Sequence, residues 1–194
     1  MRDPARELVV EDVDLTHARS MKRIPSSYES SERLRLLRTR DAGSERWELS
    51  REAVAGGIHK TYDSGDLDGW LEMYAEYPGI DRLHFIQACV AGQPVGLLTW
   101  ARMEWNDTLW LVDIRVRVSN RRNGVGSALL GRLQTHARRL RVRGMQVETQ
   151  ITNVPAVNFY TSHGFEICGF NDRLYTNGDY NSQDVALFLF WERR

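Results

Sequence analysis

The sequence has no net charge, no long apolar run and only two cysteines. Acidic and basic residues number 26 each in the 194-residue chain, so no overall positive field attracts it to nucleic acid or to an anionic membrane. No apolar run reaches the roughly 18 residues of a membrane span, and the first residues are charged where the apolar core of a signal peptide should begin. We therefore expect a cytoplasmic protein that neither spans nor binds a membrane.

Cysteine is too scarce to form a disulfide framework. The two cysteines, Cys89 and Cys168, lie in segments with the composition of strands. Neither has the spacing of a metal ligand set or of a Cys-x-x-Cys redox motif. We therefore expect two buried thiols in a reducing compartment, and no metal.

The apolar pattern and the turn residues predict an α/β (α+β) protein with one domain over residues 1–194. We expect strands at residues 7–15, 84–90, 95–103, 108–118, 145–151, 165–170 and 185–191. We expect helices at residues 28–40, 45–55, 70–77, 124–141 and 154–162, and a loop at 60–69. This order predicts a mixed, mostly antiparallel sheet of about seven strands with flanking helices.

The most informative segment covers residues 116–130. A β-branched run ends in a polar turn, and then Gly124 and Gly126 open an amphipathic helix. The first turn of a helix presents backbone N–H groups at the positive end of its dipole, and a glycine lets a phosphate approach the main chain closely. The segment therefore predicts a phosphate site, although a Gly-x-Gly at a helix start is also compatible with a purely structural turn.

Three familiar motifs are absent from the chain. No lysine follows Gly126, which excludes a Walker loop. Leu129 stands where a dinucleotide fingerprint requires its third glycine. No Gly-x-Ser-x-Gly occurs, so nothing indicates a serine nucleophile of the hydrolase type.

The glycine loop instead forms the first of two motifs that resemble the GNAT N-acetyltransferase superfamily. It reads Arg-x-x-Gly-x-Gly, and after the next predicted strand come Asn-x-x-Ala-x-x-Phe-Tyr and Gly-Phe. The residues of the two motifs are Arg121, Gly124, Gly126, Asn153, Ala156, Phe159, Tyr160, Gly164 and Phe165. The resemblance implies a GNAT-type sheet, an acetyl-CoA-binding core at residues 83–191, and an acceptor-site part within residues 1–82.

The resemblance also implies how acetyl-CoA is held as the cosubstrate. The backbone of Val116–Val118 would bind the pantetheine arm, and the N–H groups from Arg122 to Ser127 would surround the pyrophosphate. Arg121 would stabilise the loop or reach a phosphate, and Asn153 and Asn158 would contact the cofactor near its thioester. The complete expected set is Val116, Arg117, Val118, Arg121, Arg122, Asn123, Gly124, Val125, Gly126, Ser127, Asn153 and Asn158.

Catalysis in this superfamily is direct attack of an amine on the thioester. Tyr160 stands where many members place the general acid that protonates the departing thiolate, and its alternative is a half-buried structural tyrosine. A carboxylate, or a water molecule held by one, usually removes the proton of the ammonium. Asp113, an acid within an apolar strand, is the first candidate for this base and Glu148 the second. The alternative for both is an ion pair with one of three nearby arginines, Arg115, Arg117 and Arg143.

Shorter patches resemble the streptothricin acetyltransferase branch. They are Trp105–Asp107, Asp113-Ile114, Glu148–Gln150 with Asn153, Val185–Phe188 and, upstream, Lys60–Tyr62. The chain departs from this branch at Asn171, where the branch tends to have an acid and here Asp172 follows. A one-residue step along a strand changes the face of the sheet, so Asp172 need not inherit the role.

These patches favour a small-molecule amine as the acceptor, with no nucleic acid or membrane partner. Carboxylates and aromatic rings would surround its charge, namely Asp113, Glu148, Asp172, Asp179, Trp105, Tyr175 and Tyr180, although ordinary packing is the alternative for the rings. A drug-modifying enzyme that confers antibiotic resistance, and a homodimer, are further hypotheses. A protein or peptide N-acetyltransferase and a non-catalytic acyl-CoA-binding module stay open as alternatives.

Overall fold

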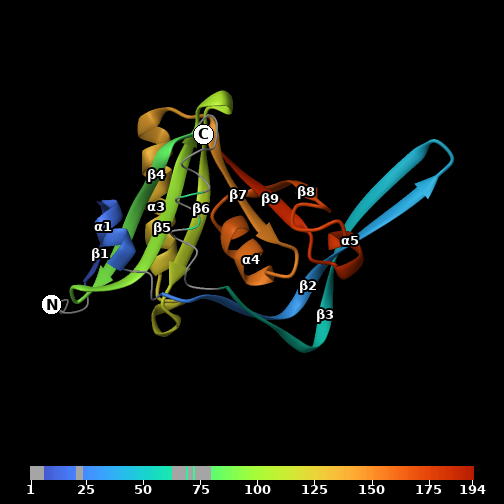
Figure 1. The fold of residues 1–194 in the computed structure, drawn as a ribbon, viewed down its shortest axis with the longest axis horizontal. Helices are drawn as coiled ribbons and strands as arrows, with labels where there is room; N and C mark the ends of the chain where they lie inside the picture. The colour runs from blue at the N-terminus through green and yellow to red at the C-terminus, as the bar shows by residue number, and fades with distance from the viewer. Residues whose placement is uncertain (1–6, 21–23, 63–68, 70–71, 73–79) are drawn as a thin grey trace. The chain divides into compact units, whose positions relative to one another are not determined.

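A computed structural model describes residues 7–20, 24–62, 69, 72 and 80–194 of the chain. Seven strands form one sheet in the order β1-β4-β5-β6-β7-β9-β8, and β2 and β3 form a second, two-stranded sheet (Figure 1). The pairs β1–β4, β4–β5, β5–β6 and β8–β9 are antiparallel, whereas β6 and β7 are parallel. The mixed, mostly antiparallel sheet expected from the sequence is confirmed.

The chain divides into two compact units. The first comprises residues 1–26, 61–147 and 191–194, and the second comprises residues 27–60 and 148–190. Strands β7 (Gly144–Gln150) and β9 (Ala186–Glu192) each contribute residues to both units. The single domain expected from the sequence stays a prediction.

The first unit is an antiparallel sheet with a helix on each face. Its elements are β1 (Leu8–Val13), α1 (Leu15–Ser20), β4 (Ile80–Val90), β5 (Gln93–Met103), η2 (Glu104–Asn106), β6 (Thr108–Val116), η3 (Val118–Asn120) and α3 (Val125–Leu140). Helix α3 packs closely on β5, because a Cβ atom at Gly96 would lie 3.0 Å from the side chains of Val125 and Leu129. The neighbouring Leu97 points to the other face, where it packs with Ala18 of α1.

The second unit contains the two-stranded sheet, α4 (Val154–Ser162), β8 (Glu166–Asn171) and α5 (Asp179–Ser182), with parts of β7 and β9. Strands β2 (Ser26–Asp41) and β3 (Ser44–Tyr62) join at a tight turn in which Gly43 has a φ of +85°. Leu34 of β2 donates its backbone N–H to the carbonyl of Ile151, which follows β7. The ring of Trp47 on β3 lies 4.8 Å from that of Phe170 on β8.

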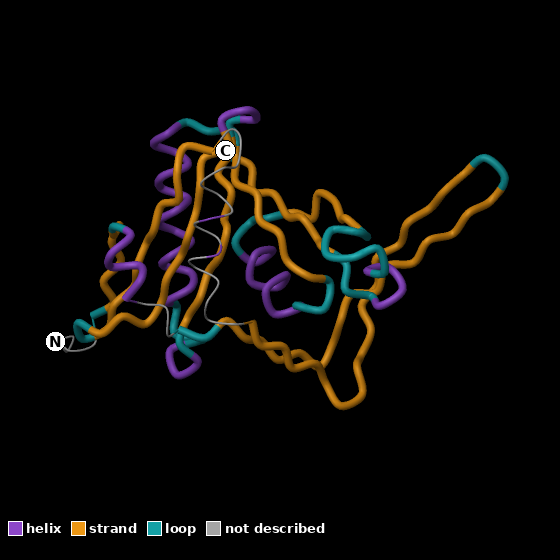
Figure 2. Tube along the Cα trace, in the orientation of Figure 1, coloured by secondary structure: helices purple, strands orange, loops and turns teal. Residues whose placement is uncertain are grey.

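The expected helices at residues 28–40 and 45–55 are wrong, since both segments are strands (Figure 2). The prediction followed their content of Glu, Arg and Leu, which are strong helix formers. Burial in β2 instead alternates, with Leu34 and Leu36 buried and Arg35 exposed between them. Arg33 and Arg35 both contact Glu52 of β3, at 2.5 and 3.4 Å, as two side chains on one face of a strand do.

Most of the other expected helices and strands are present in the structure. Helices α3 and α4 and the strands β4 to β9 lie within a few residues of the expected ranges, and α1 and α5 were not expected. Residues 60–62 belong to β3 rather than to a loop, while the rest of that loop and the helix at 70–77 fall largely outside the described residues. Both cysteines are free thiols, but Cys168 is exposed and Cys89 is only partly buried, so the expected burial of both is wrong. Within the described ranges, no helix is long and apolar enough to cross a membrane.

Candidate active site

The predicted site residues are distributed over both units. Asp113 and the segment Val116–Ser127 belong to the first unit. Glu148, Asn153, Asn158 and Tyr160 belong to the second. The structure therefore gives two sets of contacts, and each set is described within its own unit.

The loop between β6 and α3 is held by its own backbone and by one arginine. Arg117 N donates to Val95 O at 2.8 Å, which extends the pairing of β6 with β5 past the end of the strand. The Nε atom of Arg121 donates to Val116 O at 3.1 Å and so joins the end of β6 to the start of the loop. Of the two roles expected for Arg121, this contact serves loop stabilisation, and a phosphate contact stays a prediction.

Just before the N-terminus of α3, two residues of the loop have left-handed backbone conformations. Arg122 has a φ of 62° and Gly124, the N-cap residue, a φ of 80°. No side chain caps this 16-residue helix, so its first turn keeps its N–H groups for backbone or ligand acceptors. Gly124 is exposed, and nothing lies within 4 Å of where its Cβ would stand. These features fit a pyrophosphate bound through the main chain.

Asp113 follows an irregularity in β6. Thr99 of β5 is paired with Asp113 and Trp100 with Leu111, so Val112 is an extra residue on β6. The Oδ2 atom of Asp113 lies 2.5 Å from Nε of Arg115, and the two side chains are 11% and 4% exposed. Asp113 therefore has the ion-pair partner that was its alternative to catalysis. Arg117 and Arg143 direct their Nε atoms to the backbone oxygens of Pro94 and Asn106 instead.

The two asparagines predicted to contact the cofactor both have protein partners. Asn153 is the N-cap of α4, and its Oδ1 accepts a hydrogen bond from Ala156 N at 3.2 Å. Asn158 is exposed, and its Oδ1 accepts from Nη2 of Arg51 on β3 at 2.7 Å. Any contact of these residues with the cofactor stays a prediction.

Tyr160 lies on the buried face of α4 with Val154 and Val157. Its side chain is 4% exposed, and the rings of Phe159 and Phe165 lie 5.3 and 5.5 Å from its own. The tyrosine is thus more deeply buried than the half-buried structural residue that was its alternative. Its part in proton transfer stays a prediction.

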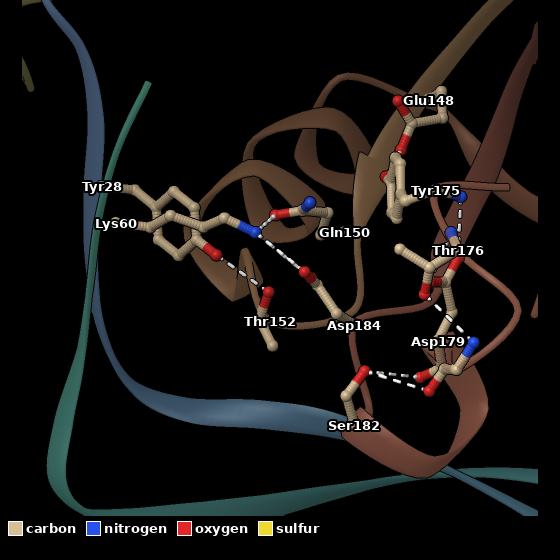
Figure 3. Close-up of polar contacts among 11 residues, drawn as sticks. Tyr28, Lys60, Glu148, Gln150, Thr152, Tyr175, Thr176, Asp179, Ser182 and Asp184 are labelled. Carbon is tan, nitrogen blue, oxygen red and sulfur yellow. Dashed lines mark hydrogen bonds and ion pairs between the residues drawn. The ribbon is translucent and has the colours of Figure 1, made fainter. Parts of the chain in front are cut away.

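Glu148 takes part in a cluster of polar side chains in the second unit (Figure 3). The hydroxyl of Tyr175 donates to its Oε1. Burial raises the pKa of Glu148 above its ordinary value; the Tyr175 hydrogen bond and the charge of Lys60 lower that pKa, and the charge of Asp184 raises it further. The balance leaves the pKa raised, and any part of Glu148 in proton transfer stays a prediction.

Lys60 connects three segments of this cluster. Its Nζ donates to Oε1 of Gln150 at 2.7 Å and to both carboxylate oxygens of Asp184, at 3.2 and 3.0 Å. Sequence reasoning singled out Lys60 and Gln150 only as parts of short patches, and it missed Asp184. A usable signal was the scarcity of lysine, because Lys22 and Lys60 are the only two in the chain.

Asp179, another residue of the expected acceptor set, is a structural acid. Its carboxylate is buried and accepts hydrogen bonds from Tyr175 N, Thr176 N and the Thr176 hydroxyl, at 2.8, 2.8 and 2.6 Å (Figure 3). Burial alone would raise its pKa, but these hydrogen bonds lower it below the ordinary value. Tyr180 is likewise engaged, since its hydroxyl accepts from Arg38 N at 3.1 Å. Trp105, which is 75% exposed, belongs to the first unit with Asp113.

A seven-stranded mixed sheet with a glycine loop at the start of α3 places the chain among α/β proteins whose helix N-terminus can receive a phosphate group. The model of the Acetyltransferase (GNAT) family matches residues 47–165, and the chain therefore belongs to this family. It is accordingly an N-acetyltransferase with acetyl-CoA as its cosubstrate, which removes the alternative of a non-catalytic module.

Three relatives illustrate the similarity. Streptothricin acetyltransferase A of Bacillus subtilis (strain 168) is 28% identical over 147 residues, which cover 75% of this chain and 80% of that protein. The crystal structure of nourseothricin acetyltransferase has a TM-score of 0.76 at 22% identity and covers 95% of this chain and 98% of its own. A protein of Bacillus anthracis str. Ames assigned as a streptothricin acetyltransferase, solved with acetyl coenzyme A, has a TM-score of 0.75 at 25% identity and covers 96% and 100%.

Proposed function

We propose that the chain acetylates a primary amine of a small cationic molecule, streptothricin or a similar antibiotic. The observation that carries the proposal is the cluster around Glu148, in which, among the described residues, the charges of one carboxylate, Asp184, and one ammonium, Lys60, which form an ion pair, both act on the Glu148 carboxyl. With both carboxylates ionised the cluster has one excess negative charge, and an ammonium ligand neutralises it. The relatives named as streptothricin acetyltransferases support the same class of acceptor.

The residues proposed to hold acetyl-CoA are those of the β6–α3 loop. The main chain from Arg122 to Ser127 receives the pyrophosphate at the N-terminus of α3, and Val116–Val118 receive the pantetheine arm. When bound, acetyl-CoA supplies an activated acetyl thioester. Asn153 and Asn158 are proposed as further contacts near that thioester.

The reaction assigned to the protein is the displacement of the CoA thiolate by the amine, with one proton transfer from the substrate ammonium and one to the departing thiolate. Glu148 takes a proton from the substrate ammonium, and the freed amine nitrogen forms a bond to the thioester carbon while the carbon–sulfur bond breaks. Tyr160 gives its hydroxyl proton to the departing thiolate. We assign the base to Glu148 rather than Asp113, because Asp113 is paired with the buried Arg115 whereas Glu148 has a raised pKa.

We also propose that residues 1–194 act as one catalytic domain, with residues 1–82 contributing to the acceptor site. Lys60 supports this proposal, since it belongs to that N-terminal part and contacts Gln150 and Asp184. A cytoplasmic location, a homodimer and a role in antibiotic resistance remain hypotheses that cell fractionation, sedimentation and drug-susceptibility measurements would test.

Release of free thiol from acetyl-CoA, measured with a panel of amines, tests the proposed function. We expect turnover with streptothricin and lysine-like amines and little with peptides that offer an N-terminal amine. Turnover with peptides alone would instead support the alternative of a protein or peptide N-acetyltransferase. Glu148→Gln should lower kcat by about tenfold or more, because it removes the base. Glu52→Gln, which alters an ion pair of β2 and β3, is the matched control and should leave kcat unchanged.

A further inference from the structure

The segment of residues 175–184 reaches two residues of β7, one by a direct hydrogen bond and one through Lys60. Glu148 and Gln150 are two positions apart on this strand and therefore share a face of the sheet. Tyr175 donates to Glu148, and Asp184 binds Lys60, which in turn donates to Gln150. Residues 175–184 thus reach this face of β7 from both of their ends (Figure 3).

Asp179 fixes the conformation of that segment. Its carboxylate binds the backbone N–H groups of Tyr175 and Thr176, and its own carbonyl oxygen accepts from Asp184 N at 3.0 Å. One buried residue therefore sets the backbone at both ends of the segment. The arrangement leaves Glu148 with a hydroxyl donor on one carboxylate oxygen and a fixed pair of opposite charges nearby.

We propose that Tyr175, Lys60 and Asp184 are positioning residues for the acceptor reaction: Tyr175 holds the Glu148 carboxylate through its hydrogen bond, and the Lys60–Asp184 ion pair is held at Gln150, on the same face of β7 as Glu148. The inference rests on the proposed function, since it assumes that Glu148 receives the proton of the acceptor ammonium. It adds three residues to that site, contributed by β3 and by the segment 175–184.

The three residues do not all shift the pKa of Glu148 in the same direction. The Tyr175 hydroxyl and the Lys60 ammonium stabilise an ionised Glu148, so removing either raises the pKa of that carboxyl. The Asp184 carboxylate repels an ionised Glu148, so its removal lowers that pKa. Within the part of the chain that the structure describes, Tyr175, Asp184 and Lys60 are the side chains that shift the pKa of Glu148.

The test is the pH profile of kcat/KM, measured by thiol release with one fixed amine. Activity that needs an ionised Glu148 falls on the acid side as that group becomes protonated. Tyr175→Phe and Lys60→Met should move this acid limb to higher pH by about 0.5 unit or more, and Asp184→Asn should move it to lower pH by a similar amount. Lys60→Met and Asp184→Asn break the same ion pair, so a merely structural role predicts the same direction for both.

Matched variants and a direct control complete the experiment. Arg35→Met and Glu52→Gln alter an ion pair of the same charge type within the same two-stranded sheet and should leave the acid limb in place. Lys60→Arg keeps the positive charge and should restore the parental profile. Glu148→Gln should abolish the limb. If Lys60→Met does not fold, as judged by thermal unfolding, Tyr175→Phe tests the same predicted shift of the acid limb to higher pH. Tyr175 is a partly exposed residue.

The possible failures are distinguishable. If no amine supports thiol release from the parent enzyme, the proposed function is wrong. If turnover occurs but Lys60→Met and Asp184→Asn shift the limb in the same direction, or neither shifts it, the inference is overturned while the function stands. Persistence of the limb in Glu148→Gln would likewise overturn it.

Discussion

Asp113 and Arg115 form an ion pair within a single strand, with Oδ2 and Nε 2.5 Å apart and both side chains nearly inaccessible to water. The two residues are two positions apart on β6 and so project from the same face. A buried guanidinium is costly unless a carboxylate accompanies it. The pair therefore accounts for an acid in an otherwise apolar strand without assigning it to catalysis.

Asp113→Asn should consequently act on stability more than on chemistry. Removing the charge takes the Asp113 carboxylate away from the buried Arg115, which costs about 3 kcal/mol and lowers Tm by roughly 6–12 °C. Asp107→Asn is the matched control, because its pair with Arg102 is 2.9 Å long but has side chains 51% and 39% exposed. That variant should cost below about 1 kcal/mol. Circular dichroism melts measure both, and equal losses would show that burial of the Asp113 pair is unimportant.

The main chain at Gly124 is the second point to test. Gly124→Asp adds a side chain to a residue with a φ of 80° and places a negative charge at the N-terminus of α3, where the pyrophosphate is proposed to bind. We expect acetyl-CoA binding, measured by calorimetry, to be lost. Gly43→Asp is matched in conformation, with a φ of 85° and open space around it, but lies at the turn between β2 and β3. Binding lost equally in both variants would point to general misfolding.

Much of the fold was predictable because local signals agreed with the final packing. In α3 the buried residues Val125, Leu129, Leu133 and Ala137 recur at helical spacing, and the glycine that precedes them marks its start. In β2 and β3 the local signals disagreed. Composition favoured helices, whereas the alternation of Leu34 and Leu36 with exposed residues, and the two arginines around Glu52, followed the period of a strand.

The candidate site likewise has features that local sequence motifs predict and contacts that they do not. The glycine loop and Asn153 lie on continuous motifs, so their places at the starts of α3 and α4 follow from sequence spacing, whereas the capping role of Asn153 was not predicted. The contact between Lys60 and Asp184 joins residues 124 positions apart, and no pattern within either segment encodes it. The pairing of Asp113 with Arg115, rather than Arg117 or Arg143, depended on which side chains share a face of β6 and on where the other arginines donate.

Tyr160 offers a test of the departing-group step. Tyr160→Phe removes only the hydroxyl, so the ring packing with Phe159 and Phe165 is retained. We expect kcat to fall by roughly tenfold or more while the Kd for acetyl-CoA stays nearly constant, as loss of a general acid predicts. Tyr28→Phe serves as the control, since Tyr28 is also buried and its hydroxyl lies 2.8 Å from Oγ1 of Thr152. An unchanged kcat in Tyr160→Phe would remove this residue from the mechanism.

Asp12 links β1 to α3 and should make the first unit sensitive to acid. Its Oδ2 lies 2.5 Å from Arg132 and its Oδ1 lies 2.6 Å from Nε2 of His136. Burial works to raise the pKa of Asp12, but the hydrogen bonds from Arg132 and His136 outweigh it and hold the pKa below the ordinary 3.8. A carboxyl with a lowered folded-state pKa stabilises the protein at pH values above its unfolded pKa, and this stabilisation is lost as pH falls through the folded pKa.

Asp12→Asn should therefore lower Tm at pH 7 by roughly 2–4 °C, which corresponds to about 1 kcal/mol for a partly exposed pair. The difference between the parent and the variant should shrink as pH falls below about 4 and vanish once Asp12 is protonated in the folded protein. Asp14→Asn is the comparison, because Asp14 pairs with His17 at a site where both side chains are more than half exposed. Its effect at pH 7 should be smaller. A difference between the parent and Asp12→Asn that stayed constant from pH 7 to pH 2 would show that the ionised carboxylate contributes nothing, and that Asp12 acts only through its shape and hydrogen bonds.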